Sequence, residues 1–556
     1  MDSTAEIRAK AKTKIIITLV TLLIISMQNA AKAKQGIFFN KKEYVPMQVP
    51  VFETTRNKLP CPVFEEDPDY IRCYWKVWEL AFRNFHEPAK GSGFVSQFID
   101  AAFNQNIFLW DTCFMTIFCN YAHPYVPGIC SLDNFYAKQH EDGEICREIN
   151  RTTGKDFEPW VNAENEPLFS RWGYAWAKGN KKTKVIYKGR PVPTPNPKLT
   201  LDSLNHPILA WAELESHRLT GDTDRLRLVW EPLVQYHAVL KKYLKQGNGL
   251  YITDSASMDN ATRNIHLESG GTGIDISSEM VLFARNLAEI ATILNKRSEA
   301  KQYRREAEEL SALINQHMWD EKRKFYFDLT LEGERAPVKS IAAFWTLLAK
   351  VASKSQAEAL AAELENPNTF GTVHRVPTLA ADEPGFDPEG GYWNGAVWAP
   401  TNSMIVTGLE NYGYKELARK IALNHLSNVV AIFKDTGTLW ENYAPQYIAP
   451  GKPSKGDFVG WTGIGPIAFL IEYAIGIRAD AVANRITWDI HSPRRVGVER
   501  FWFGGKTVSL ICDDVDASGI RRVTIRSDGS FHLVVKSGGK TKTVQVPADQ
   551  QIQLGL

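Results

Sequence analysis

Apolar residues recur at three- and four-residue spacing along most of this 556-residue chain, which predicts a predominantly helical region from residue 68 to residue 477. The helices come in pairs, and the loops between pairs are rich in Gly, Asp, Trp and Asn. Paired helices with such loops at one end are typical of an (α/α)6 barrel, a toroid of helical hairpins. Because about twelve helices of roughly 15 residues would fill the span, we expect this mainly α domain at residues 68–484. The helical pattern is clearest over residues 201–219, 224–244, 278–294, 299–318, 340–351, 356–364, 398–411, 414–432 and 465–475.

The segment 154–198 interrupts the helical pattern. Four of its prolines alternate with other residues at its end, at Pro191, Pro193, Pro195 and Pro197, and this favours an extended, stiff chain over a helix. Long insertions in compact domains are usually lids or binding loops and less often disordered. We expect a lid-like insertion over one end of the barrel, with a disordered loop as the alternative.

After residue 485 the pattern changes to short alternating runs typical of strands, with hairpin turns at Gly504-Gly505, Asp528-Gly529 and Gly538-Gly539. We therefore expect a small β-sandwich at residues 485–556. Packing against the helical domain is its favoured role, and carbohydrate binding is the alternative. The predicted strands cover residues 486–490, 500–503, 506–512, 522–526, 531–536 and 542–546.

Residues 1–33 have the features of a signal peptide. A basic stretch ending at Lys14 precedes an apolar run over 15–25, and Ala31-Lys32-Ala33 offers a cleavage site. The run is too short to span a bilayer. We expect export to the periplasm or the medium, with an uncleaved membrane tether as the alternative, and an N-terminal extension at residues 34–67.

The charge balance and the cysteines argue against several classes of partner. The chain has 65 Lys and Arg against 63 Asp and Glu, which gives no electrostatic case for binding nucleic acid or an anionic membrane. Among the seven cysteines there is no CxxC pair and no Cys/His metal spacing. We expect no metal and no other cofactor. No pattern assigns a disulfide pairing or an oligomeric state.

Asp259 lies in a polar turn, Ser257-Met258-Asp259-Asn260, after an extended stretch at 249–253. An aromatic-lined pocket would favour the protonated form of such a carboxyl group, which could then act as a general acid. Arg263, four residues later, is placed to orient Asp259 or to contact a sugar hydroxyl. The alternative is an Asp that caps the following helix.

Glu441 lies between Trp440 and Tyr443, just after a turn at Gly437-Thr438. Aromatic residues on both sides are uncommon for a solvated surface acid, although an exposed Glu at a helix end is the alternative. One carboxylic acid together with one carboxylate is the equipment for protonating a glycosidic oxygen while activating a water molecule.

Tryptophan, amide and acidic side chains recur at the boundaries between helix pairs, in a chain with 16 Trp. Trp offers a flat platform to a sugar ring, Asp accepts from vicinal hydroxyls, and Asn both donates and accepts. Core packing or helix capping is the alternative for each residue taken singly. The predicted sugar-binding residues are Trp110, Asp111, Arg263, Tyr392, Trp393, Asn394, Trp398 and Trp461.

Four of these segments together resemble clan G glycoside hydrolases, which include trehalase, glycoside hydrolase family 63 and mannosylglycerate hydrolase. The segments are Trp110-Asp111, the Asp259 turn, residues 392–400, and Glu441 with Trp461, and the similarity spans residues 108–477. The resemblance implies an inverting α-glycosidase on an (α/α)6 barrel, acting without metal on an α-linked di- or oligosaccharide or small glycoside.

The resemblance also implies roles for single residues. Asp259 matches the general acid and Glu441 the general base, while Asp111, Trp393 and Trp398 match residues that line the subsite for the released sugar. By the same comparison Asn205 is a sugar-binding residue.

Three positions depart from the pattern of these relatives. The acid motif has Ser257-Met258 where relatives have Ser-Gly, Asn205-His206-Pro207 stands in place of Gln-Pro-Pro, and Asn394 stands where relatives often have Arg. The last two changes bear on which sugar is bound.

Two other classes of function remain as alternatives. (α/α)6 toroids also include sugar epimerases and polysaccharide lyases, which need His or Tyr for proton transfer, and His206 and His266 are the candidates. The second alternative is a non-catalytic glycan-binding protein that keeps the pocket.

Overall fold

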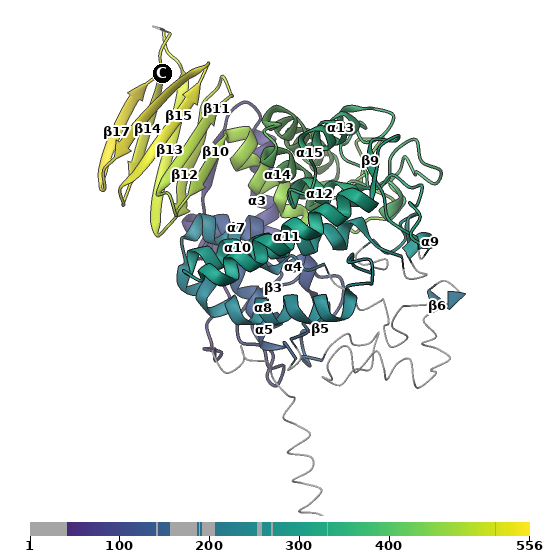
Figure 1. Cartoon of the computed structure of the whole chain (residues 1–556). Helices are drawn as coiled ribbons and strands as arrows, with labels where there is room; N and C mark the ends of the chain where they lie inside the picture. The colour runs from purple at the N-terminus through teal and green to yellow at the C-terminus, as the bar shows by residue number, and fades with distance from the viewer. Residues whose placement is uncertain are drawn as a thin grey trace, which may run out of the picture.

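The computed structural model describes residues 42–140, 143–155, 206–252, 258–267, 271–330, 332–517 and 519–556, with the short strand pair β6 (Ile186–Tyr187) and β7 (Arg190–Pro191). A helical body carries a β-rich region at one end (Figure 1). The predicted signal peptide, Asn205 and, apart from its first two residues and this strand pair, the predicted insertion lie outside the described residues. No helix within the described ranges has the length and apolar character needed to cross a bilayer.

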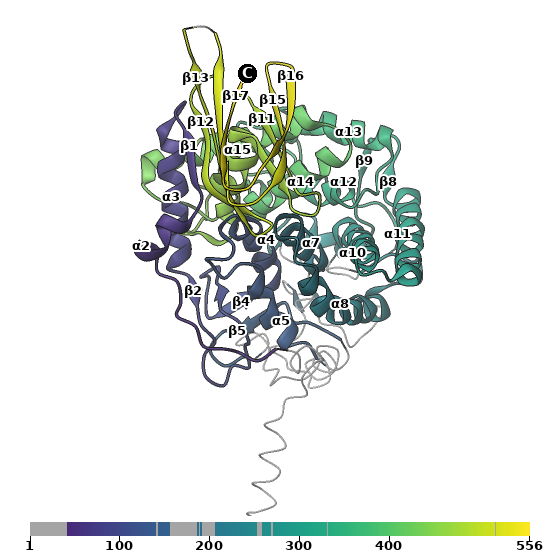
Figure 2. The same cartoon turned by 90° about the vertical axis from the view of Figure 1, so that its left-hand side faces the viewer.

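Amphipathic helices build the helical body, and their apolar faces merge into one core cluster. Successive helices pack as neighbours: α10 lies beside α11, and α14 beside α15 (Figure 2). The longer helices are α3 (Pro68–Phe82), α4 (Leu109–Cys119), α7 (Leu209–Thr220), α8 (Thr223–Leu244), α10 (Ile274–Ile293), α11 (Arg297–His317), α13 (Lys354–Glu365), α14 (Ala399–Asn411), α15 (Lys415–Thr436) and the π-helix η8 (Gly465–Ile475).

Local sequence signals set several helix ends. The Asp67 side chain accepts from the backbone of the first turn of α3, and α13 begins with a capping box between Ser353 and Gln356. Gly221 and Gly437 end α7 and α15 with φ angles of 72°, a left-handed conformation that glycine adopts without steric cost.

Short elements connect the helices and position the loops at their ends. They are α2 (Phe52–Thr55), η1 (Arg56–Lys58), β2 (Phe85–His86), β3 (Phe98–Ile99), β4 (Asn106–Phe108), η2 (Asn120–Ala122), η3 (Ile129–Leu132), α5 (Asp133–Ala137), β5 (Glu148–Asn150), α9 (Asn264–Leu267), β8 (Trp319–Asp320), β9 (Phe325–Tyr326), η5 (Ile341–Phe344), α12 (Trp345–Leu348), η6 (Tyr392–Asn394) and η7 (Gly460–Ile464).

Most of the predicted helices are confirmed, and two predicted ranges differ from the structure. The helix expected at 340–351 is two short turns, η5 and α12, and the chain leaves them through Lys350 at a φ of 56°. Of the helix expected at 201–219, residues 201–205 lie outside the described part of the chain, and α7 begins at Leu209, two residues after Pro207, which disfavours helical backbone in the residue before it.

The β-rich region consists of two sheets. One has five strands in the order β1-β12-β13-β14-β17, and the other has four in the order β10-β11-β15-β16, with β11 and β15 parallel. Phe503 and Phe531, one from each sheet, meet with ring centroids 5.5 Å apart. The strands are β1 (Cys61–Phe64), β10 (Ile477–Asp480), β11 (Arg485–Ile490), β12 (Val496–Phe503), β13 (Lys506–Val515), β14 (Arg521–Ser527), β15 (Phe531–Ser537), β16 (Lys540–Val546) and β17 (Gln550–Gly555).

These sheets extend beyond the predicted range of 485–556. β10 precedes it, and β1 comes from the N-terminal extension and pairs antiparallel with β12. Strand pairing between residues as distant in the chain as Cys61 and Glu499 leaves no local signal, so the sequence pattern could not reveal β1 as part of the sheet.

The sheets are attached to the helical body by specific contacts. The Trp488 indole nitrogen donates to the Ile475 carbonyl at the end of η8, at 2.9 Å. Tyr121, just after α4, packs its ring against Phe501 of β12. The β-rich region therefore packs directly against the C-terminal ends of η8 and α4.

Candidate active site

A cavity of about 350 Å³ opens where several helices of the body begin. Its walls come from β4, the start of α4, β5, the turn at 258–264, η6 and η7. We call it the aromatic cavity. It is lined by Phe103, Asn104, Phe108, Trp110, Asp111, Arg147, Glu148, Asp259, Tyr392, Trp393, Trp398 and Trp461.

Four tryptophans form one wall of the aromatic cavity. Trp393 and Trp398 stack with centroids 4.2 Å apart and planes inclined by only 6°. Trp110 meets Trp393 and Trp461 edge-on, at 6.3 and 5.8 Å. Because each ring is fixed by its neighbours, the wall offers a rigid apolar face that suits stacking against the ring of a bound sugar.

Asp111 lies in the first turn of α4 and is 7% exposed. Burial raises the pKa of its carboxyl group to about 8, and the nearby charge of Glu148 acts in the same direction. At neutral pH this side chain is therefore mostly protonated and can donate a hydrogen bond as well as accept one.

The turn that carries Asp259 is tied to the segment that carries the stacked tryptophans. Asn260 accepts from the Trp393 backbone N–H at 2.9 Å and donates to the Gly391 carbonyl at 3.0 Å. The Asn394 side-chain oxygen accepts from the backbone N–H and the hydroxyl of Thr262, at 2.9 and 2.8 Å. These four bonds hold Asp259, itself exposed, at the edge of the cavity.

Arg263 belongs to the same turn and anchors it in the protein interior. Its side chain is 1% exposed and forms ion pairs with Asp275 at the start of α10 and with Asp328. It is absent from the cavity lining, so the environment of Arg263 differs from the sugar contact expected from the sequence. Spacing along the chain placed it near Asp259, but the two carboxylates that bury it come from distant segments.

Glu441 is 5% exposed and lies directly behind the cavity wall. The Tyr392 hydroxyl donates to one carboxylate oxygen at 2.8 Å, and the Lys455 backbone N–H donates to the other at 3.2 Å. The Trp461 indole nitrogen donates to the Glu441 backbone carbonyl at 2.9 Å. Two residues that line the cavity, Tyr392 and Trp461, thus fix both the side chain and the backbone of Glu441.

The electrostatics of Glu441 reflect two opposing effects. Burial raises the pKa of its carboxyl group, while the hydrogen bonds from Tyr392 and Lys455 favour the charged form. The negative charge of Asp259 raises the pKa of Glu441 further, so the two carboxyl groups are near enough to interact. Tyr392 itself has a φ of 62°, a conformation unusual for a bulky residue and often found at functional sites.

The structure therefore brings most of the sequence-predicted residues to one place. Glu441 adjoins the cavity, Asn394 and Arg263 hold the Asp259 turn, and Asn205 is outside the described residues. The predicted residues that line the cavity are Trp110, Asp111, Asp259, Tyr392, Trp393, Trp398 and Trp461.

Sequence reasoning missed five residues of the lining. Phe103, Asn104 and Phe108 precede Trp110 and could have been included from their position alone. Arg147 and Glu148 stand in a segment without an aromatic motif, and they reach the cavity because β5 pairs with β4, with Phe108 opposite Glu148.

The histidines proposed for an epimerase or lyase are not part of the cavity lining, although the His206 ring packs against Trp110 at 6.1 Å between centroids. His206 is 1% exposed and its Nδ1 lies 2.6 Å from a Glu279 carboxylate oxygen. Neither it nor His266 lines the aromatic cavity. Within the described part of the chain, no group of three or more His, Cys, Asp or Glu side chains could hold a metal ion.

Comparisons with known proteins relate the chain to glycoside hydrolases. A family described as the mannosylglycerate hydrolase MGH1-like glycoside hydrolase domain matches residues 175–462. An uncharacterized protein of Borreliella burgdorferi is 27% identical over 62% of this chain and 75% of its own length. A mannosylglycerate hydrolase of Rubrobacter radiotolerans is 30% identical over 32% of this chain, but the match spans only 39% of that enzyme.

The fold is also that of solved enzymes. The crystal structure of the family 63 mannosylglycerate hydrolase of Thermus thermophilus, in complex with Tris and D-glycerate, superimposes with a TM-score of 0.52 at 19% identity. The match covers 71% of this chain and 98% of that one. Since the family match takes in more than half of the sequence, the chain belongs to the mannosylglycerate hydrolase MGH1-like family of glycoside hydrolases.

Proposed function

We propose that this protein is an inverting α-glycosidase with Asp259 as general acid and Glu441 as general base. The observation that carries the proposal is that Asp259 lines a tryptophan-walled cavity whose Tyr392 and Trp461 are bonded to Glu441. Two carboxyl groups at one sugar-sized site are the minimum equipment for hydrolysis of a glycosidic bond.

In the proposed reaction the sugar ring stacks against Trp393 or its neighbours, with hydroxyls near Asp111. Asp259 gives its proton to the glycosidic oxygen as the bond from that oxygen to the anomeric carbon breaks. Glu441 takes a proton from a water molecule, whose oxygen forms the new bond to the anomeric carbon from the opposite face. Such a geometry needs about 6.5–9.5 Å between the two carboxyl groups.

Tyr392 has a supporting part in this mechanism. Burial raises the pKa of its hydroxyl well above the ordinary value, so the group stays protonated and donates to Glu441. This bond favours the ionised form that a base requires, and it holds one carboxylate oxygen in a fixed position.

We further propose that the helical body is an (α/α)6 barrel, with the aromatic cavity at one end of its axis, and that the protein is exported. The helix pairs and the fold likeness to the Thermus enzyme support the first proposal, and the N-terminal basic and apolar segments support the second.

The substrate is proposed to be an α-linked di- or oligosaccharide or a small α-glycoside. Named relatives include mannosylglycerate hydrolases, a probable mannosyl-oligosaccharide glucosidase of Schizosaccharomyces pombe and a cytosolic neutral trehalase of Kluyveromyces lactis. The matches span between 18% and 39% of the length of these relatives, so their substrates define a panel for assay.

The test is release of free monosaccharide from that panel: mannosylglycerate, trehalose, and α-linked gluco-, manno- and galacto-disaccharides. We expect hydrolysis of at least one member, with water incorporated into the released sugar. An unsaturated product would indicate a lyase, and an isomerised but uncleaved sugar an epimerase. Saturable binding without turnover would indicate a glycan-binding protein and contradict the proposal.

A further inference from the structure

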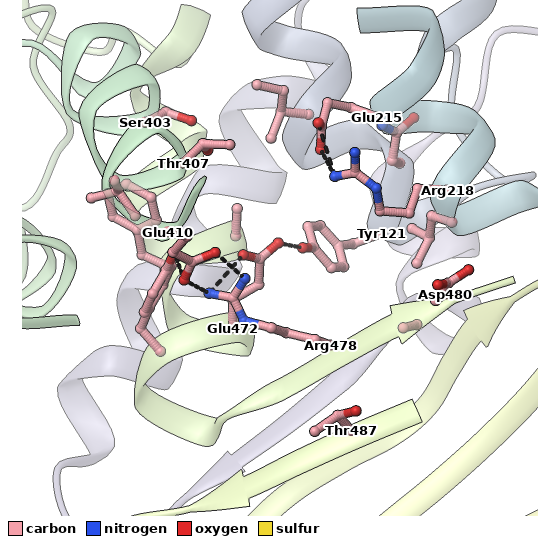
Figure 3. A pocket seen from close by; sticks show the side chains of 18 of the residues that line it. Tyr121, Glu215, Arg218, Ser403, Thr407, Glu410, Glu472, Arg478, Asp480 and Thr487 are labelled. Atoms are coloured by element: carbon pink, nitrogen blue, oxygen red, sulfur yellow. Dashed lines mark hydrogen bonds and ion pairs between the residues drawn. The ribbon is translucent and has the colours of Figure 1, made fainter. Parts of the chain in front are cut away.

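A second cavity, of about 420 Å³, lies between the helical body and the β-rich region (Figure 3). We call it the junction cavity. Its walls come from α4, η2, α7, α14, α15, η8, β10, β11 and β15. A volume in this range suits a small ligand, since binding pockets for small molecules measure about 300–1,000 Å³.

The junction cavity lies at the far ends of the helices that carry the aromatic cavity. On α4, Asp111 lines the aromatic cavity near the first residue, and Ile117 lines the junction cavity near the last. Trp398 precedes α14 and lines the first cavity, while Glu410 near the end of α14 lines the second. The two cavities therefore share no lining residue, although they share helices.

One side of the junction cavity is a fixed network of charged and phenolic groups. Arg478 donates to both carboxylate oxygens of Glu410, at 2.8 and 2.6 Å, and lies 3.6 Å from Glu472. Tyr121 donates to Glu472 and Tyr473 donates to Glu410. Paired in this way, the acids and the guanidinium keep their positions and still present further donor and acceptor sites to a ligand.

A second ion pair, on α7, and two hydroxyl groups, on α14, line two further sides of the junction cavity. Arg218 donates to both carboxylate oxygens of Glu215, at 2.9 and 3.0 Å. Ser403 and Thr407 stand one turn apart on α14, with their side chains toward the cavity (Figure 3). Hydroxyl groups and planar charged pairs around one cavity can bind the vicinal hydroxyls of a sugar.

The hydroxyls of Ser403 and Thr407 make no hydrogen bond with any described residue. This contrasts with other helical hydroxyls of the chain, since Thr292 donates to the Ala288 carbonyl and Ser311 to the Ala307 carbonyl. Ser403 is only 5% exposed. A largely buried hydroxyl that makes no hydrogen bond to a carbonyl of its own helix and faces a cavity is available to a ligand.

The charge of the lining argues for a neutral ligand. Four acidic side chains face five basic ones, and most of them are already paired with each other. Trp211 and Phe469 add apolar surface to the same lining. A strongly anionic or cationic ligand would have to break existing ion pairs, whereas a hydroxyl-rich neutral molecule can use their remaining bonding capacity.

We propose that the junction cavity is a second carbohydrate-binding site, which takes a neutral mono- or disaccharide. The hydroxyls of Ser403 and Thr407 contact the sugar from one side, and the Glu215–Arg218 pair and the Arg478 network contact it from the others. This site does not depend on the proposed hydrolysis, because none of its residues belongs to the aromatic cavity.

The test is hydrogen–deuterium exchange of the full-length protein, followed by mass spectrometry, during titration with glucose, mannose, galactose and their α-linked disaccharides. We expect one of these sugars to slow exchange in residues 403–411 and 477–487, with a saturable dose dependence. Segments around Asp259 and Trp393 report the aromatic cavity separately, so failure of either proposal leaves the other measurable.

Two substitutions locate the site. Ser403→Ala and Thr407→Val remove the unbonded hydroxyls with little change of shape, and each should weaken binding at the junction cavity about tenfold, the usual effect of one lost hydrogen bond. Ser311→Ala, on α11 and away from both cavities, is the matched control and should leave binding unchanged.

Three outcomes would overturn the proposal. The first is no protection of these segments by any sugar, which would make the cavity a solvated gap between the sheets and the helices. The second is unchanged protection in both hydroxyl variants. The third is stronger protection by inorganic phosphate than by any sugar, which would identify an anion site.

Discussion

The two carboxyl groups proposed to act in catalysis have different surroundings. Asp259 is exposed, and its neighbours Asn260 and Thr262 are hydrogen-bonded to Trp393 and Asn394 of the tryptophan segment. Glu441 is buried, and its own carboxylate oxygens accept bonds from Tyr392 and Lys455. A general acid must reach the glycosidic oxygen and be reprotonated by solvent after each turnover. A general base must hold one orientation toward a single water molecule. Substitutions around the two carboxyl groups should therefore have different effects.

Replacing either carboxyl group should have the largest effect, and the loss of turnover should be similar for the two replacements. We expect Asp259→Asn and Glu441→Gln each to lower turnover by about 10²–10⁴-fold, the usual contribution of a general acid or base. Thermal unfolding should change little. The measurement is the hydrolysis rate at saturating substrate, and normal activity in either variant would remove that residue from the mechanism.

The buried support of the Asp259 turn should have the next largest effect. Arg263→Met leaves Asp275 and Asp328 buried without their cation, which should lower the free energy of unfolding by about 3–5 kcal/mol. Denaturant unfolding measures this loss. We also expect reduced turnover in the protein that remains folded.

Arg225 offers a matched control for that experiment. It pairs with the fully buried carboxylates of Asp133 and Glu213, and none of the three lines the aromatic cavity. Arg225→Met should destabilise the protein by a similar amount but leave the turnover of the folded fraction unchanged. Equal turnover of the two folded variants would show that Arg263 does not position Asp259.

Loosening the Asp259 turn should affect the acid and spare the base. Asn394→Ala removes the two bonds to Thr262 and should lower turnover about tenfold, while the acid limb of the pH–rate profile, assigned to Glu441, keeps its position. Asn424→Ala is the control, since Asn424 also bonds backbone groups of a neighbouring segment, at Val373 and Arg375, outside the cavity. A shifted acid limb in Asn394→Ala would mean that the turn also sets the state of Glu441.

The converse change removes a hydrogen bond to the base itself, and its effect should be the smallest. The Tyr392 hydroxyl stabilises the ionised form of Glu441, so Tyr392→Phe should raise the pKa of that carboxyl group. The ionised base is then lost at a higher pH as acid is added, and the acid limb of the pH–rate profile should move upward by about one unit. Tyr136→Phe, which removes a similar bond to Glu213, is the control and should not move the limb. An unchanged limb in Tyr392→Phe would contradict the role given to this hydroxyl.

Periodicity predicted the elements of this fold far better than their assembly. The predicted ranges 224–244 and 465–475 correspond to α8 and η8, because each carries its apolar residues at helical spacing. The Asp222 cap marks the start of α8, and Gly476 marks the end of η8. β1 was not predictable as part of the sheet, since its partner β12 lies at the other end of the chain.

The site shows the same division: single residues were predictable from the sequence, but their contacts were not. Trp393 and Trp398 were predicted as sugar-binding residues from composition and motif, and both line the cavity, but their mutual stacking depends on the tertiary fold. Arg263 was placed near Asp259 by spacing, whereas its burial between Asp275 and Asp328 depends on segments far along the chain. Glu148 reaches the cavity only through strand pairing.

The configuration of the first-formed product tests the central claim most directly. Proton NMR during hydrolysis of an α-linked substrate distinguishes the two anomers before they interconvert. A base that activates water on the face opposite the acid predicts that the β-anomer appears first. Initial release of the α-anomer would mean a covalent or same-face mechanism, and it would contradict the roles assigned to Asp259 and Glu441.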